Sequence, residues 1–133
     1  MIKLLIGAKG SGKTKTLIEM VNSATENSKG SVVCIEKGDK LIHDVTYKAR
    51  LIDTDAYSIF DSEALYGFIA GILASNSDIT DVFVDSALKI VCNDLVAFEK
   101  MLGKLESISK DVNLVMTSSI PVDECPAGIK AYV

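Results

Sequence analysis

The chain has 133 residues, of which 48% are hydrophobic and 24% charged, and its formal net charge is −4. This size and composition are typical of one folded domain, here residues 1–133, and they exclude a disordered chain. The acidic balance, with lysines scattered along the sequence rather than gathered in a run, argues against nucleic acid as a partner.

The first 30 residues predict a strand, a glycine-rich loop and a helix in succession. The apolar run Ile2–Ile6 is typical of a short buried strand. Beyond the loop, apolar residues recur at helical spacing, at Leu17, Ile18, Val21 and Ala24. Between these two segments, residues 7–14 read GAKGSGKT and match the phosphate-binding pattern G-x-x-x-x-G-K-[ST].

This loop predicts a binding site for ATP and Mg²⁺. Its glycines allow successive backbone N–H groups to point inward around a phosphate, and the helix N-terminus adds its dipole. Lys13 is expected to contact the β- and γ-phosphates, which also makes it a candidate catalytic residue, and the Thr14 hydroxyl is expected to bind Mg²⁺. The predicted nucleotide-binding residues are Gly7, Lys9, Gly10, Ser11, Gly12, Lys13, Thr14 and Lys15. The alternative is a Gly- and Lys-rich turn that binds no ligand.

The rest of the chain alternates expected strands with expected helices. Strands are expected at Ser31–Glu36, Arg50–Asp53, Ile79–Asp85 and Asn113–Thr117. Helices are expected to begin near Asp61 or Ser62 and near Asn93, and the tail 121–133 is expected to form a short helix or an edge strand. This alternation predicts a three-layer α/β/α fold of the P-loop NTPase type, with a mainly parallel sheet of about five strands.

Asp85 is the second candidate ligand of Mg²⁺. It follows the apolar residues Val82, Phe83 and Val84, which fits the Walker B pattern of a hydrophobic strand that ends in an aspartate. In that role its carboxylate lies opposite Thr14, in the outer shell of the ion. The alternative is an aspartate that ends a strand and caps the residues that follow.

The residue that would activate water for ATP hydrolysis is less clearly marked. Hydrolytic ATPases of the RecA-like and AAA-like branch usually have a glutamate directly after the Walker B aspartate, but here that residue is Ser86, a poor base. Glu36, at the expected end of the second strand, is the candidate catalytic base, and Asp53 and Asp55 are weaker candidates. The alternative for Glu36 is a solvated carboxylate at a strand end.

Two further polar features lie at expected strand ends. Thr117, Ser118 and Ser119 form either a sensor of the γ-phosphate or a polar exit from the last strand. Arg50, the only arginine, is a candidate catalytic residue that a neighbouring subunit delivers to the γ-phosphate. Its alternative role is a surface ion pair with Asp53 or Asp55.

Missing residues argue against several subfamilies of nucleotide-binding proteins. GTPases need N-K-x-D and D-x-x-G motifs, and neither occurs here. Kinases of nucleotides and small molecules typically use several arginines to neutralise phosphate. ParA- and MinD-type ATPases carry a lysine directly after the first glycine of the loop, where this chain has Ala8.

The remaining sequence features predict a cytoplasmic protein. Cys34, Cys92 and Cys125 are an odd set without a C-x-x-C pair, and His43 is alone, which argues against disulfides and zinc. No apolar run approaches the ~20 residues of a membrane span. The chain begins directly with an expected strand, so no signal peptide is expected.

Four segments together resemble a known group of proteins. IGAKGSGKT, VVCIEKGDKL, YKARLID and VFVDS are similar to very small, stand-alone P-loop proteins of anaerobic Gram-positive bacteria. Members of this group are labelled ATP-binding proteins or, loosely, PilT-like. The resemblance implies a cytoplasmic ATP-binding protein of the additional-strand P-loop class.

The sequence as a whole predicts an Mg-ATP-binding protein that hydrolyses ATP slowly and acts as a switch, through self-association or a protein partner. Two alternatives stay open. One is a non-hydrolysing ATP-binding subunit that regulates a partner protein, and the other is a small phosphotransferase.

Overall fold

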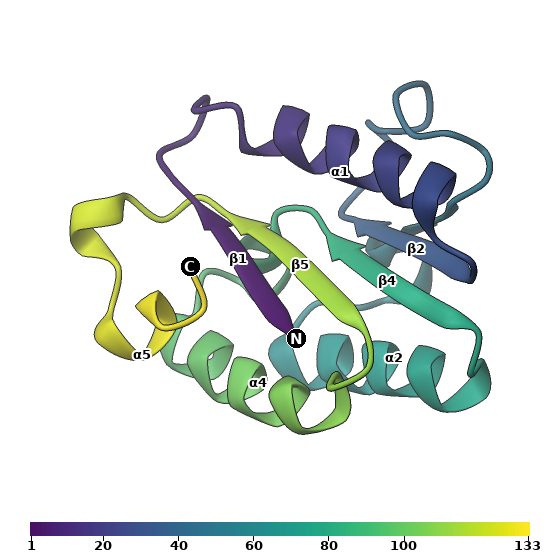
Figure 1. Ribbon diagram of the computed structural model, residues 1–133. Coiled ribbons are helices and arrows are strands. Elements are labelled where there is room, and N and C mark those ends of the chain that lie inside the picture. The colour runs from purple at the N-terminus through teal and green to yellow at the C-terminus, as the bar shows by residue number, and fades with distance from the viewer.

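The computed structural model describes residues 1–133, and its centre is a five-stranded sheet (Figure 1). The strands are β1 (Ile2–Ile6), β2 (Ser31–Glu36), β3 (Arg50–Asp53), β4 (Ile79–Val84) and β5 (Asn113–Ser118). The helices are α1 (Lys13–Asn27), α2 (Ser62–Ser75), α3 (Ala87–Ile90), α4 (Leu95–Ile108) and α5 (Ala127–Lys130), with 3-10 turns at Thr54–Tyr57 and Val122–Glu124.

All neighbouring strands run parallel, in the order β1-β5-β4-β2-β3. The last strand of the chain, β5, therefore lies between the strand that leads into the glycine loop and the strand that leads to Asp85. Because the strands are parallel, their carboxyl ends meet at one edge of the sheet, where ligands of open α/β sheets bind.

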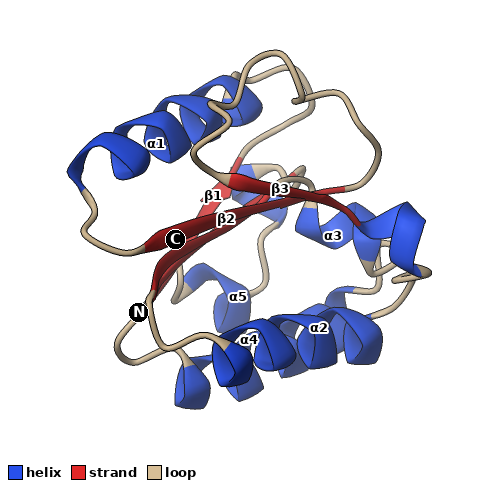
Figure 2. Ribbon diagram, turned by 90° about the vertical axis from the view of Figure 1, so that its right-hand side faces the viewer, coloured by secondary structure: helices blue, strands red, loops and turns tan.

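Helices cover both faces of the sheet and make three layers (Figure 2). On one face lies α1, which buries Leu17 and Val21 against the sheet together with the segment 37–49. On the other face lie α2 and α4, over the larger core around Phe98. The short helices α3 and α5 contribute residues to the same core. The three-layer α/β/α fold with a parallel five-stranded sheet is confirmed.

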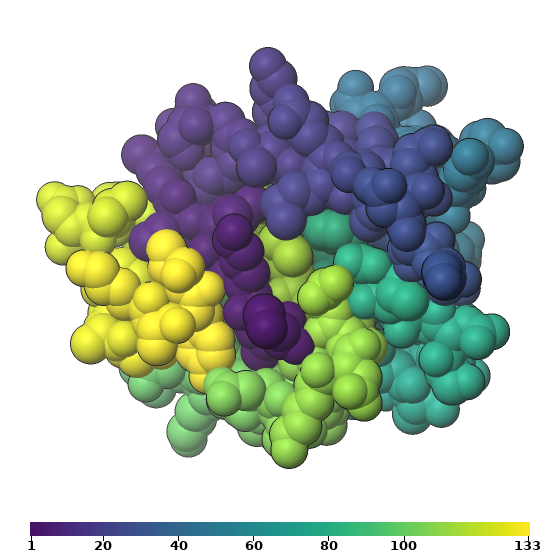
Figure 3. Space-filling model, viewed as in Figure 1, coloured from purple at the N-terminus to yellow at the C-terminus, as the bar shows by residue number.

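The first strand has a free outer edge that the end of the chain partly covers. Leu4 N–H donates to the carbonyl oxygen of Tyr132 at 2.8 Å. The space-filling view shows the C-terminal residues, in yellow, against the first strand, in purple (Figure 3). The tail forms short helices, as one of the two predicted alternatives has it, and no strand.

The expected element boundaries agree with the structure to within two residues. The helix expected near Asp61 or Ser62 begins at Ser62, because the Asp61 carboxylate accepts the N–H of Ala64 and caps it. The helix expected near Asn93 begins at Leu95, after a cap by Asp94. The one-turn helix α3, between β4 and α4, was not expected, since four residues are too few for a periodic pattern.

Candidate functional site

The glycine loop connects β1 to α1 with a backbone that favours glycine at three points, Gly7, Gly10 and Gly12, all with positive φ angles. Gly10 and Gly12 have φ angles of +84° and +91°, in the left-handed region. Gly12 precedes α1 and provides no side chain to cap it. The first N–H groups of this 15-residue helix therefore have no side-chain cap, which suits an anionic ligand at this end.

Lys13 folds back over the same loop. Its ammonium group donates to the carbonyl oxygen of Ala8 at 2.9 Å and to the Ser11 hydroxyl at 3.4 Å. The charge is thus held over the loop, where the sequence predicts the β- and γ-phosphates. Lys9, Gly10 and Ser11 are exposed on the loop around it.

Thr14 and Asp85 meet across a distance of 71 residues in the sequence. The Thr14 hydroxyl donates to Asp85 Oδ1 at 3.1 Å. Asp85 is 9% exposed and directly follows Val84, the last residue of β4, as the Walker B interpretation requires. Hydroxyl and carboxylate oxygens are ligands that Mg²⁺ accepts, and the ion typically takes its other ligands from phosphate and water. These two residues therefore fit Mg²⁺ bound with a nucleotide.

Thr117 supports Asp85 from β5. Its hydroxyl donates to Asp85 Oδ1 at 2.8 Å and accepts the N–H of Ser86 at 2.8 Å. Thr117 is 1% exposed, and its bond to Asp85 is buried, whereas its bond from Ser86 is partly buried. Of its neighbours, Ser118 is buried and accepts the N–H of Leu88, whereas Ser119 is exposed at the cleft described below.

Glu36 lies beside Asp85 on the neighbouring strand, since Asp85 N–H donates to the carbonyl oxygen of Ile35. The residue is only 3% exposed, so the interpretation of Glu36 as a solvated carboxylate at a strand end is wrong. Oε1 accepts the N–H of Lys40 at 3.0 Å, and Oε2 accepts the N–H of Leu41 at 3.1 Å. Burial raises the pKa of the Glu36 carboxyl, and the nearby charge of Asp85 adds to that rise against these two hydrogen bonds.

A cleft of about 730 Å³ opens above these residues at the carboxyl edge of the sheet. Its size is within the range of small-molecule sites. Five lysines contribute to its lining, and no carboxylate does: Lys9, Lys13, Lys15, Lys40 and Lys89. In a chain with a net charge of −4, this local excess of cations indicates an anionic ligand.

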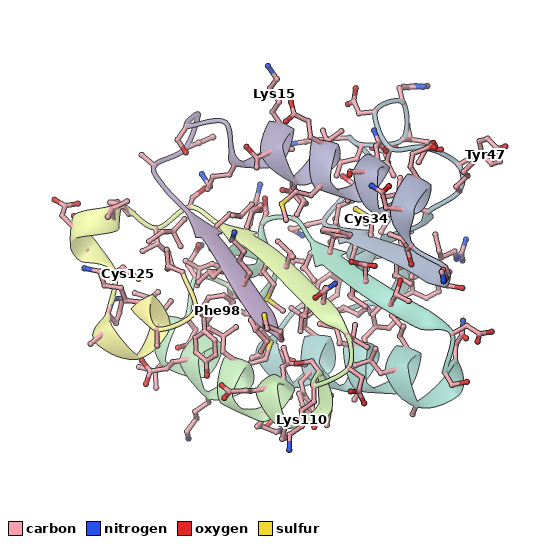
Figure 4. The ribbon with its side chains drawn as sticks, viewed as in Figure 1. Lys15, Cys34, Tyr47, Phe98, Lys110 and Cys125 are labelled. Carbon is pink, nitrogen blue, oxygen red and sulfur yellow. The ribbon has the colours of Figure 1, made fainter.

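Two of these lysines were missed by the sequence analysis. Lys40 belongs to the turn after β2, and Lys89 belongs to α3 after β4. Each follows a strand that ends at the same edge, and that position is the signal that could have identified them. Lys15 was predicted to bind nucleotide, and it contributes to the lining of the cleft. Its side chain extends from α1 away from the sheet (Figure 4).

Arg50 is far from the glycine loop. It is exposed at the first position of β3, the edge strand four places from β1. At ~4.8 Å per strand, this is roughly 19 Å across the sheet. The alternative ion pair with Asp53 or Asp55 is wrong, because Asp55 pairs with Lys37 at 2.7 Å and Asp53 accepts backbone N–H groups.

The structure also describes two features that bear on metal and membrane binding. No group of three or more His, Cys, Asp or Glu side chains is arranged to hold a metal ion without other ligands. None of the helices combines the length and the apolar character that a membrane span requires.

Comparisons with known proteins bear on the fold. No protein-family model matches the chain, and no curated protein matches it. Among solved structures, that of PCH-2 from C. elegans is similar, with a TM-score of 0.57 and 15% sequence identity. The match covers 99% of this chain but 33% of the PCH-2 chain, so the chain spans about a third of that protein's length. At this identity, the likeness shows a shared α/β fold alone.

Proposed function

We propose that this chain binds Mg-ATP at the glycine loop and hydrolyses it slowly, as a switch. The observation that carries this proposal is the contact of Thr14 with Asp85 beneath the lysine-lined cleft. A glycine loop alone is also compatible with a Gly- and Lys-rich turn that binds no ligand. A loop whose threonine meets a strand-end aspartate has both oxygen ligands that Mg-ATP uses in P-loop proteins.

The position of β5 supports membership of the additional-strand P-loop class. In this chain, one strand separates the loop strand β1 from the aspartate strand β4. That arrangement is what the resemblance to small stand-alone P-loop proteins implies. The adenine base, the switch role and the cytoplasmic location belong to the same proposal.

Slow hydrolysis follows from the residues beside Asp85. Ser86 replaces the usual glutamate, and both carboxylate oxygens of Glu36 accept backbone N–H groups. We expect turnover well below the ~10 s⁻¹ typical of enzymes. The same observation favours a second candidate, an ATP-binding subunit that does not hydrolyse ATP and regulates a partner.

Titration calorimetry with Mg-ATP tests the binding proposal through Lys13→Ala. Loss of a charge-assisted contact of this kind costs roughly 1.5–3 kcal/mol, which is about a 10- to 150-fold weaker affinity. The control is Lys48→Ala, which removes an exposed lysine of the segment 37–49 that pairs with Glu26 of α1. Equal affinities of Lys13→Ala and the parent would contradict the proposal.

Phosphate release without any added acceptor then separates the candidate activities. Turnover of ATP alone supports the slow ATPase. Tight binding without turnover supports the regulatory subunit. Turnover that needs an added acceptor metabolite supports the small phosphotransferase.

A further inference from the structure

The turn that follows β2 is held in place by the buried carboxylate of Glu36. Its two oxygens accept the N–H groups of Lys40 and Leu41, the residues four and five positions ahead. Leu41 is 3% exposed and packs beneath α1 with Leu17. The backbone of Lys40 therefore has a defined place, although the turn carries no regular secondary structure.

Two further contacts fix the start of the same turn. The N–H of Gly38 donates to Asp53 Oδ1 at 2.8 Å, and the Lys37 ammonium group pairs with Asp55 at 2.7 Å. The turn is thus attached to the end of β3 as well as to β2 and α1. Such an attachment lowers the entropy that a side chain on the turn must lose when it contacts a ligand.

Lys40 is the exposed side chain that this anchored turn brings to the cleft. It lines the cleft together with Lys13 and Thr14. Lys9, Lys13 and Lys15 belong to the glycine loop and the start of α1, so Lys40 and Lys89 are the two lysines that come from other elements. Lys89 is on the four-residue helix α3. The side chains of Lys40 and Lys89 are both exposed, and Lys40 is favoured because the Glu36 carboxylate fixes its backbone.

Hydrolysis of ATP in P-loop proteins is accelerated by a further cation at the γ-phosphate, in addition to the P-loop lysine, here Lys13, and Mg²⁺. The water oxygen forms a bond to the γ-phosphorus, and the bond from that phosphorus to the bridging oxygen breaks with its electron pair going to ADP. The proton of the water passes to an oxygen of the released phosphate or to solvent. Negative charge gathers on the γ-phosphate oxygens during this step, and an arginine usually meets it. The single arginine, Arg50, is at the far edge of the sheet.

We propose that Lys40 supplies this cation within the same chain, and that Glu36 is a positioning residue that acts through Lys40. The proposal rests on the proposed function, because it assumes a nucleoside triphosphate in the cleft. It gives the buried Glu36 a role other than that of the catalytic base. It also makes hydrolysis independent of a neighbouring subunit.

The test measures ATP affinity by calorimetry and phosphate release at saturating ATP, for the parent, Lys40→Ala and Lys40→Arg. Removal of one preorganised donor to a transition-state charge typically costs about 10²- to 10³-fold in kcat. Since Lys40 is exposed, we expect the low end, about 10²-fold in Lys40→Ala, with ATP affinity within a few-fold of the parent. Lys40→Arg is expected to keep at least a tenth of the parent rate. Lys48→Ala, on the same segment, is the matched control and should behave as the parent.

A double-mutant cycle tests the role of Glu36. In Glu36→Gln, an amide NH₂ faces one of the two backbone N–H groups, so the turn loses an anchor and turnover falls. If Glu36 acts through Lys40, Glu36→Gln causes no further loss in a Lys40→Ala background. If Glu36 is the base, the two losses multiply. Urea unfolding of each variant shows that the comparison is made on folded protein.

Each other outcome overturns the proposal. Unchanged turnover in Lys40→Ala overturns it, whether or not Lys89→Ala loses turnover. A parent that binds ATP without turnover overturns it too. Multiplying losses in the cycle overturn the role of Glu36. Failure of the proposed function is distinguishable, because it is measured on the parent alone, which then shows no ATP binding in calorimetry or no phosphate release. The variants decide the role of Lys40 in a parent that hydrolyses ATP.

Discussion

Thr117→Val tests the buried network around Asp85 without any ligand. Valine has nearly the shape of threonine, so the substitution removes the hydroxyl and leaves the packing of β5 almost unchanged. Two hydrogen bonds disappear, the one to Asp85 Oδ1 and the one from the N–H of Ser86. Both lie at a residue that is 1% exposed.

The size of the effect follows from these two bonds. A hydrogen bond to a charged group contributes about 1.5–3 kcal/mol, and a buried N–H without a partner costs about 1–3 kcal/mol. Asp85 keeps the Thr14 hydroxyl as a donor, and Ser86 is only half-buried, so the two costs do not add in full. We expect the free energy of unfolding to fall by about 2–4 kcal/mol.

Urea denaturation followed by circular dichroism measures this difference. The control is Thr16→Val, which removes an exposed hydroxyl that donates to the carbonyl oxygen of Gly12 within α1. We expect that control to change stability by less than about 0.5 kcal/mol. A Thr117→Val protein as stable as the parent would refute the reasoning, because it would mean that the Asp85 network contributes nothing to the fold.

Thr14→Val deletes a predicted ligand of Mg²⁺, so we expect it to remove the gain in ATP affinity that Mg²⁺ provides. Calorimetry with and without Mg²⁺ measures this gain, and a variant that keeps the full gain would contradict the prediction. Arg50→Ala is expected to match the parent in turnover per subunit across a dilution series, because Lys40 supplies the cation within one chain. A turnover per subunit that falls on dilution, and falls further in the variant, would instead show an arginine that acts between subunits. The pKa of the Glu36 carboxyl is raised, so the folded protein binds this proton more tightly than the unfolded chain does. The stability that the bound proton contributes is fully present below about pH 4.5, the ordinary pKa of the group, and is lost as the pH rises through the folded-state pKa. The stability of the parent relative to Glu36→Gln should therefore fall across that range in urea titrations, and a constant difference would contradict the assignment.

The local features of this protein were determined by its sequence alone. The glycine loop is a contiguous motif, and the strands and long helices follow from periodicity within short windows, as β4 and the Asp85 that follows it illustrate. These signals need no knowledge of the rest of the chain. The parallel arrangement also follows, because alternating strands and helices permit few other topologies.

The tertiary structure alone decided which of these elements meet. The strand order places Thr117 against Asp85, and the path of the turn after β2 buries Glu36 and brings Lys40 to the cleft. It also leaves Arg50 at the opposite edge of the sheet. Such contacts join residues that are far apart in the chain, and they depend on strand register and on the packing of α1. No local pattern encodes that register, so the sequence identified the loop and its aspartate, whereas the partners of both had to come from the fold.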